Sequence, residues 1–257
     1  LYIGQYLVDA DNVSGAFTAK EGTVLIADYA FSGNSGITSF SAPEGLRFIG
    51  EGAFRNCSRM ESVTLGDSLT SIGEYTFSGC SGLTEITIPD SVTSIGSEAF
   101  DDCGSLEAVY ISDLAVWFEI SFGSSTSNPL YYAGELYLND TLLTELVVPD
   151  SVTSIGDYVF CNCTGLTSVN IGNSVTDIGT RAFYGCTGLR EITVPDSVTS
   201  IGSETFSGCT GLKEVTIPDS VTSIENGAFS GCTGLTAITI PDSVTSIGSE
   251  TFSGCTG

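Results

Sequence analysis

The sequence predicts a solenoid, a stack of short coils that share one continuous core. Three residue types return with a stride of 23 residues: phenylalanine marks the stride, cysteine follows it three residues later, and isoleucine precedes it by five. The phenylalanines are Phe31, Phe54, Phe77 and Phe100, then Phe160, Phe183, Phe206, Phe229 and Phe252. Because one such unit cannot bury its own apolar face, apolar residues at a fixed stride must stack from coil to coil.

One regular unit, residues 83–103, shows how each coil is expected to fold. Residues 85–88, Glu-Ile-Thr-Ile, alternate polar and apolar side chains, which is the pattern of a half-buried strand. Pro89 ends the strand because it lacks a backbone N–H donor, and the Asp-Ser pair that follows supplies side-chain acceptors for a turn. We expect Gly96 to take a positive φ angle that other residues tolerate poorly.

The repeated pattern L-x-x-I-x-I-P-D-S-V-x-x-I-G-x-x-A-F-x-x-C resembles the BspA-like, or treponemal-type, leucine-rich repeats, and it recurs over almost the whole chain. The resemblance implies a leucine-rich-repeat solenoid: a curved, right-handed stack with a parallel β-sheet on its concave side and short strands, turns and helical turns on its convex side. It also implies a bacterial or protist surface protein that binds other molecules. The family's motif contains no catalytic residues, so none carries over.

We expect a single repeat domain over residues 1–257. Its divergent first part consists of a hairpin that turns at Gly4-Gln5 and a partial coil. The predicted blocks are the divergent part at 1–35, regular repeats at 36–104, an irregular repeat with an insert at 105–141, and regular repeats at 142–257.

The insert departs most from the repeat. Asp113 is suited to begin a short helix, and Asn139-Asp140 is suited to a hairpin turn.

The final unit ends without a polar capping sequence, which would leave strand-edge groups open and permit end-to-end self-association. Because the chain also lacks an initiator methionine and a signal peptide, we expect a fragment of a longer protein. The family resemblance implies that this protein is secreted or located at the cell surface.

The charge balance narrows the classes of partner. Acidic residues outnumber basic ones 31 to 7, which gives a formal net charge of −24. Such a surface should repel nucleic acid and anionic membranes, and it favours basic proteins, cations or neutral glycans as partners. The alternative is that the charge serves solubility alone. No run of 18 apolar residues is present, so we expect no membrane insertion.

Cysteine and histidine usage argues against metal and catalytic chemistry. Eight of the nine cysteines form a ladder at the repeat stride, and Cys161 lies off it. Parallel Cβ vectors in a ladder fit disulfide geometry poorly, so we expect free, buried thiols that act as small apolar residues. With no C-x-x-C pair and no histidine, we expect no zinc site, no cofactor and no enzyme activity.

Two groups of residues are candidate ligand-binding sites. The first is the insert, which contains the only tryptophan, Trp117, with Tyr131 and Tyr132. Aromatic residues in a non-repeating segment often mark recognition, although they could instead form a secondary core.

The second is the outward face of the sheet, where glutamates and Tyr110 lie among threonines. Solenoids use such faces for binding, but threonine is also a good sheet former. The outward positions are Ser62, Glu85, Ala108, Glu145, Ser168, Glu191, Glu214 and Ala237, with Thr64, Thr87, Tyr110, Val147, Asn170, Thr193, Thr216 and Thr239 beside them.

An acidic row at the turns could in principle attract calcium, but single carboxylates that are each engaged in a turn are expected to be structural. The row is Asp67, Asp90, Asp113, Asp150, Asp196, Asp219 and Asp242.

Together with the family resemblance, the candidate surfaces predict an adhesin-like interaction module that binds extracellular proteins or glycans. The alternative is a structural spacer that projects another domain from the cell surface, which the near-identity of the last units favours.

Overall fold

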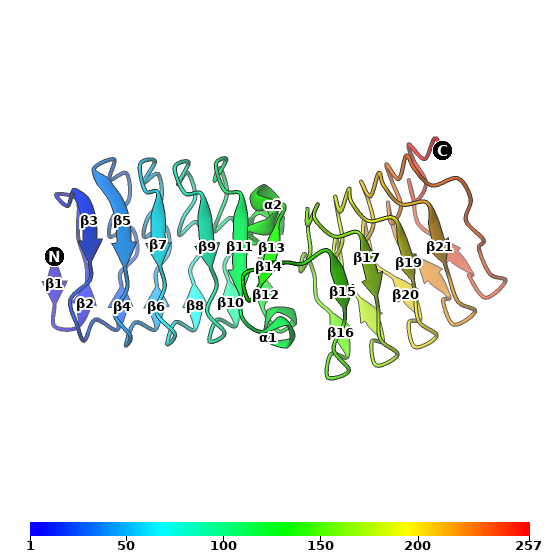
Figure 1. Cartoon of the computed structure of the whole chain (residues 1–257), viewed down its shortest axis with the longest axis horizontal. Helices are drawn as coiled ribbons and strands as arrows, with labels where there is room; N and C mark the ends of the chain where they lie inside the picture. The colour runs from blue at the N-terminus through cyan, green and yellow to red at the C-terminus, as the bar shows by residue number, and fades with distance from the viewer. The chain divides into compact units, whose positions relative to one another are not determined.

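The computed structural model describes all residues 1–257. The chain forms two compact units, which are described separately. Unit 1 comprises Leu1–Asp113, Ile120–Ala133 and Tyr137–Asp140, and unit 2 comprises Leu114–Glu119, Gly134–Leu136 and Thr141–Gly257. Within each unit, strands of successive coils lie side by side in chain order (Figure 1). No helix is long and apolar enough to cross a membrane.

Each regular coil of unit 1 contributes one strand to a front sheet and a two-residue strand to a back sheet. The front strands pair as β3-β5-β7 and as β9-β11-β13, and the back sheet runs β1-β2-β4-β6-β8-β10-β12. The front strands are β3 (Gly15–Thr18), β5 (Ile37–Ser41), β7 (Ser62–Thr64), β9 (Glu85–Thr87), β11 (Ala108–Ile111) and β13 (Leu136–Leu138). The back strands are β1 (Tyr2–Ile3), β2 (Tyr6–Leu7), β4 (Leu25–Ile26), β6 (Phe48–Ile49), β8 (Ser71–Ile72), β10 (Ser94–Ile95) and β12 (Ser121–Phe122).

Unit 2 repeats the same plan. Its front sheet runs β15-β17-β19-β21 and its back sheet β16-β18-β20-β22-β23. The front strands are β15 (Glu145–Val147), β17 (Ser168–Asn170), β19 (Glu191–Thr193) and β21 (Glu214–Thr216). The back strands are β16 (Ser154–Ile155), β18 (Asp177–Ile178), β20 (Ser200–Ile201), β22 (Ser223–Ile224) and β23 (Ser246–Ile247).

The remaining elements belong to the insert and the termini. The N-terminal hairpin is confirmed, because β1 and β2 pair antiparallel. The insert contains α1 (Leu114–Phe118), the 3₁₀ helix η1 (Ser125–Ser127), α2 (Leu130–Ala133) and β14 (Thr141–Leu142). Asn139 and Asp140 both have positive φ, 49° and 61°, as the predicted hairpin turn requires.

A ladder of phenylalanine rings fills the core of each unit. In unit 1 the rings of Phe31, Phe54, Phe77 and Phe100 stack with centroids 4.7, 5.4 and 5.3 Å apart. In unit 2 the rings from Phe160 to Phe252 stack at 5.5–5.8 Å. All but Phe252 are fully buried, which confirms that the stride places one residue type at one depth in every coil.

The cysteine ladder lies beside the phenylalanines. All nine cysteines are free thiols, and eight are buried, Cys161 included. Seven ladder thiols donate a hydrogen bond to a phenylalanine carbonyl of the preceding coil, as Cys80 does to Phe54 O at 3.1 Å. Burial raises the pKa of Cys103 and of Cys163 to about 12. The seven hydrogen-bonded thiols therefore act as small core residues with a satisfied donor.

The prediction of a positive φ at Gly96 is wrong. The positive angles occur two and six residues later, at Glu98 (φ 56°) and Asp102 (φ 55°). Gly96 is instead required by close approach: a Cβ atom there would lie 2.5 Å from the Glu74 nitrogen and 2.7 Å from the Gly73 carbonyl carbon of the coil before it. The glycine lets neighbouring coils stack in backbone contact.

Candidate recognition surfaces

The outward face of the front sheet in unit 2 is an exposed row of glutamates. Register pairing aligns Glu145 with Ser168, Ser168 with Glu191, and Glu191 with Glu214. All three glutamates are exposed. Their side chains point to solvent because they alternate with the buried Leu146, Ile192 and Val215 of the same strands. The structure thus brings three of the predicted site residues onto one face.

The front sheet of unit 1 differs from the prediction at one position. Glu85 is exposed on β9, but its register partner Ala108 is only 9% exposed. Ala108 was predicted at an outward position; instead it is buried, on the strand β11 that the insert helix α2 contacts. Tyr110, on the same strand, is half-buried and stacks on Tyr137 with ring centroids 4.9 Å apart. The insert therefore covers part of this face.

Trp117 belongs to the core of unit 2. Its side chain is 1% exposed, and its Nε1 donates a hydrogen bond to the Val159 carbonyl at 3.1 Å. Beside it, Phe118 packs edge-on against Phe160 at 5.3 Å. Trp117 is therefore too buried to contact a ligand from the surface, as its place among the candidate binding residues required. Its position supports the alternative that the aromatic residues of the insert form a secondary core.

Tyr131 and Tyr132 lie half-buried on α2, with their rings edge-to-face at 5.2 Å. The Tyr132 hydroxyl accepts a hydrogen bond from the Asp102 N–H at 3.0 Å and donates to Asp101 Oδ1 at 3.1 Å. Burial raises the pKa of Tyr132 to about 12. Tyr132 therefore ties the insert to the preceding coil, while part of each ring remains open to solvent.

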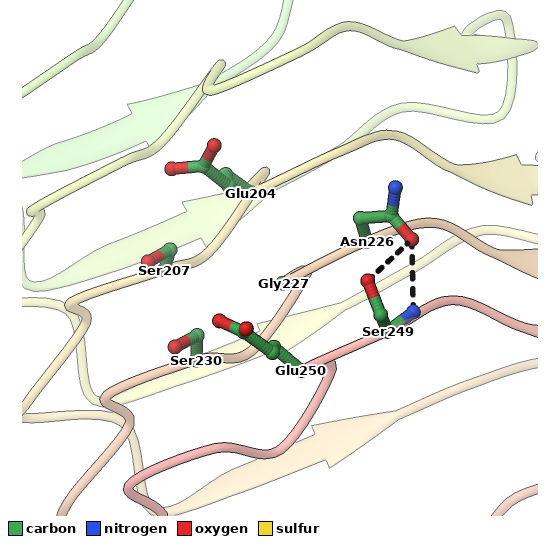
Figure 2. A pocket seen from close by; sticks show the side chains of 7 residues that line it. All are labelled: Glu204, Ser207, Asn226, Gly227, Ser230, Ser249 and Glu250. Atoms are coloured by element: carbon green, nitrogen blue, oxygen red, sulfur yellow. Dashed lines mark hydrogen bonds between the residues drawn. The ribbon is translucent and has the colours of Figure 1, made fainter.

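A polar hollow of about 340 Å³ lies on the turns of unit 2 (Figure 2). It is lined by Glu204, Ser207, Asn226, Gly227, Ser230, Ser249 and Glu250. Gly227 has no side chain, which leaves a gap between the carboxylates of the coils before and after it.

Two contacts order this hollow. Asn226 Oδ1 accepts hydrogen bonds from the Ser249 N–H at 2.8 Å and from its hydroxyl at 3.2 Å. Arg181 donates from both Nε and Nη2 to the Glu204 carboxylate at 3.0 and 2.9 Å. The sequence signal for the hollow was Gly227, at a position where every other coil except that of Gly52 carries tyrosine, glutamate or arginine.

The acidic turn residues do not gather. No group of three or more His, Cys, Asp or Glu side chains is arranged to hold a metal ion anywhere in residues 1–257. Ser112 Oγ of the next coil donates to Asp90 Oδ2 at 2.7 Å, so this aspartate accepts a hydrogen bond between coils.

Comparison with known proteins identifies the repeat. The sequence model of one protein family, described as the BspA-type leucine-rich repeat region, matches residues 3–127 and 134–257 with six copies. No curated protein sequence matches the chain.

Several solved structures are similar in fold. A leucine-rich cell surface protein of Faecalibacterium prausnitzii is 26% identical, with 95% of this chain and 86% of that chain covered and a TM-score of 0.49. A leucine-rich repeat protein of Eubacterium ventriosum is 22% identical, with 95% and 89% covered and a TM-score of 0.47. The pneumococcal vaccine antigen PcpA is 21% identical, with 95% and 74% covered and a TM-score of 0.51, which shows the fold alone.

Proposed function

The chain belongs to the BspA-type leucine-rich repeat family, and from that premise we propose that it is a non-catalytic interaction module that binds proteins or glycans outside the cell. Repeat solenoids present extended faces to their partners, and this chain has such a face in the front sheet of unit 2. A location at the cell surface or in the secreted fraction is part of the proposal. This location is the one that the family resemblance implies.

The observation that supports binding most is the glutamate row. Glu191 and Glu214 lie opposite each other on adjacent strands, and like charges in that arrangement are destabilising. The uniform sign of the row also makes the face complementary to a basic protein surface. Because the fold would be served equally by uncharged outward residues, such as the threonines beside them, the glutamates favour a role in recognition.

A binding screen tests this function. The chain is screened against extracellular-matrix proteins and a glycan array at physiological salt, and any hit is measured again with the double variant Glu191→Gln and Glu214→Gln. We expect affinity for a basic protein to fall by roughly tenfold, with a weaker dependence on salt. The control removes the same charge elsewhere in unit 2, with Asp219→Asn and Glu225→Gln, and should leave affinity unchanged.

A hit that binds the double variant as tightly as the original chain would place the site elsewhere. Tyr131→Ala then tests the exposed part of the insert. If binding is lost while the melting temperature is kept, the insert is the site.

A structural spacer is the second candidate. The units over residues 188–256 are nearly identical in sequence, and their back strands β20, β22 and β23 pair in register, while the front sheet ends at β21. Low variability along a face favours a repeated structural role over one specific epitope. The absence of any hit in the screen, with a correctly folded chain, would support the spacer.

A further inference from the structure

The outward face of the back sheet in unit 1 begins with an apolar row. Register pairing aligns Ile3 with Tyr6, Tyr6 with Leu25, and Leu25 with Phe48 across four adjacent strands. Ile3 is 68% exposed, Tyr6 49% and Phe48 46%. Adjacent exposed apolar side chains of this kind mark interaction sites more often than isolated ones do.

The repeat itself does not require this row. From Phe48 onward, the same outward position carries serine in unit 1, at Ser71, Ser94 and Ser121. In unit 2 the position is held by Ser154, Asp177, Ser200, Ser223 and Ser246. Phe48 is also preceded by Arg47, where the regular coils have threonine. The dipeptide Arg47-Phe48 thus replaces the Thr-Ser of the repeat, a signal that was visible in the sequence.

A hollow of about 540 Å³ opens beside this row. It is lined by Tyr6, Val24, Leu25, Gly45, Arg47, Phe48 and Ser68. Its walls are mostly apolar, and no acidic side chain lines it. Arg47 is exposed and makes no ion pair, and its backbone carbonyl accepts a hydrogen bond from Thr70 Oγ1 at 3.2 Å. The hollow therefore combines an apolar cleft with an available guanidinium.

We propose that this hollow docks an extended peptide segment of a partner protein, one that places a large apolar side chain next to a carboxylate. The apolar side chain would lie between Tyr6 and Phe48, and the carboxylate would pair with the Arg47 guanidinium, whose planar fork suits it. The local positive charge is complementary to an acidic group, although the chain as a whole is strongly acidic. The proposal rests on the interaction function and assigns it a second surface, distinct from the glutamate row.

A purely structural role is the competing account, because cross-strand apolar pairs also stabilise a sheet. The repeat supplies variants that separate the two. Phe48→Ser and Arg47→Thr each introduce the residue that regular coils carry at that position, so the fold should accept them. Ser94→Ala, in the same row of a regular coil, is the matched control.

The probe is a phage-displayed library of random heptapeptides selected on the immobilised chain. We expect the selected peptides to share Phe, Leu or Trp adjacent to Asp or Glu. Measured by fluorescence polarisation with the synthetic, labelled peptide, Phe48→Ser should weaken binding by roughly tenfold or more. Arg47→Thr should weaken the acidic peptide similarly and leave its amide counterpart unaffected, while Ser94→Ala and the double variant Glu191→Gln and Glu214→Gln should change neither.

Selection of peptides without an acidic residue, or equal binding by a folded Phe48→Ser variant, would overturn the proposal. The proposal would also be overturned if the chain self-associated in light scattering, or bound a glycan on an array, and Phe48→Ser abolished that signal. Either result would assign the apolar row to a different occupant. If Phe48→Ser does not fold, Arg47→Thr decides alone, since Arg47 contributes an exposed side chain. Failure of this test leaves the glutamate-row experiment intact, because the two surfaces use separate variants.

Discussion

At the scale of single residues, the repeat assigns each position a physical task. Glu98 and Asp102 mark two positions per coil that take a positive φ, and seven of the nine residues equivalent to Glu98 are not glycine. A hydrogen bond from the backbone N–H of this residue to a carbonyl of the next coil helps to hold the strained conformation, as from Arg181 N–H to Ser203 O at 2.9 Å.

Asn34 stands where the regular coils carry cysteine. Its side-chain amide donates hydrogen bonds to the backbone carbonyls of Ala10 and Val13, both at 2.9 Å, which satisfies these two acceptors in the divergent first coil.

Gly96→Ala tests the close approach of neighbouring coils. The added Cβ would lie 2.5 Å from backbone that cannot move aside as a side chain can. We expect a loss of about 1–3 kcal/mol in the free energy of unfolding, measured by urea denaturation. The control is Gly104→Ala, where a Cβ meets nothing within 4 Å and the change should be within about 0.5 kcal/mol. Equal effects of the two substitutions would contradict this account.

At the scale of elements, the insert is where the repeat pattern stops being informative. The sequence predicted a short helix after Asp113, and α1 is present at Leu114–Phe118. It could not predict that Trp117 would be buried in unit 2, because the indole's partner, Val159, lies 42 residues further along the chain. Nor could it predict that α2 would contact β11, or that Ala108 on β11 would be buried.

Trp117→Phe tests the assignment of α1 to the core. The substitution removes the Nε1 donor from a buried carbonyl and leaves unfilled volume, so we expect a loss of about 1–3 kcal/mol in stability. Urea denaturation followed by circular dichroism measures it. Glu119→Gln, at an exposed position beside the helix, should change stability by no more than about 0.5 kcal/mol. A Trp117→Phe variant as stable as the original chain would show that the indole is not part of the core.

At the scale of the whole molecule, stability is a sum over stacked coils, because each coil contacts mainly its neighbours. Features repeated at the stride therefore act together. The buried thiols are such a feature. Burial makes the largest contribution to the raised pKa of every ladder cysteine, and it raises the pKa of Cys57, Cys103 and Cys232 to about 12.

This predicts alkaline destabilisation of the folded chain. An unfolded thiol titrates near about 8.5, and the folded chain disfavours the thiolate. The stabilising contribution is therefore complete below that pH and is lost as the pH rises from about 9 toward 12. We expect the urea midpoint to fall between pH 8 and pH 10, as measured at several pH values. Cys103→Ala should show a shallower fall, and a midpoint independent of pH would refute the prediction.

The sequence by itself determined the coil, its length and its core. A residue type that returns every 23 positions must stack on its own copies, and that requirement fixes the phenylalanine ladder, the free thiols and the alternation of the front strands. The candidate glutamates Glu145, Glu191 and Glu214 followed from the same alternation. The tertiary structure alone decided which outward residues stay open, why Gly96 is a glycine, and that Phe48 lines a hollow with Tyr6. Those features depend on distances between backbones and side chains of different coils, and residue order along one coil does not encode them.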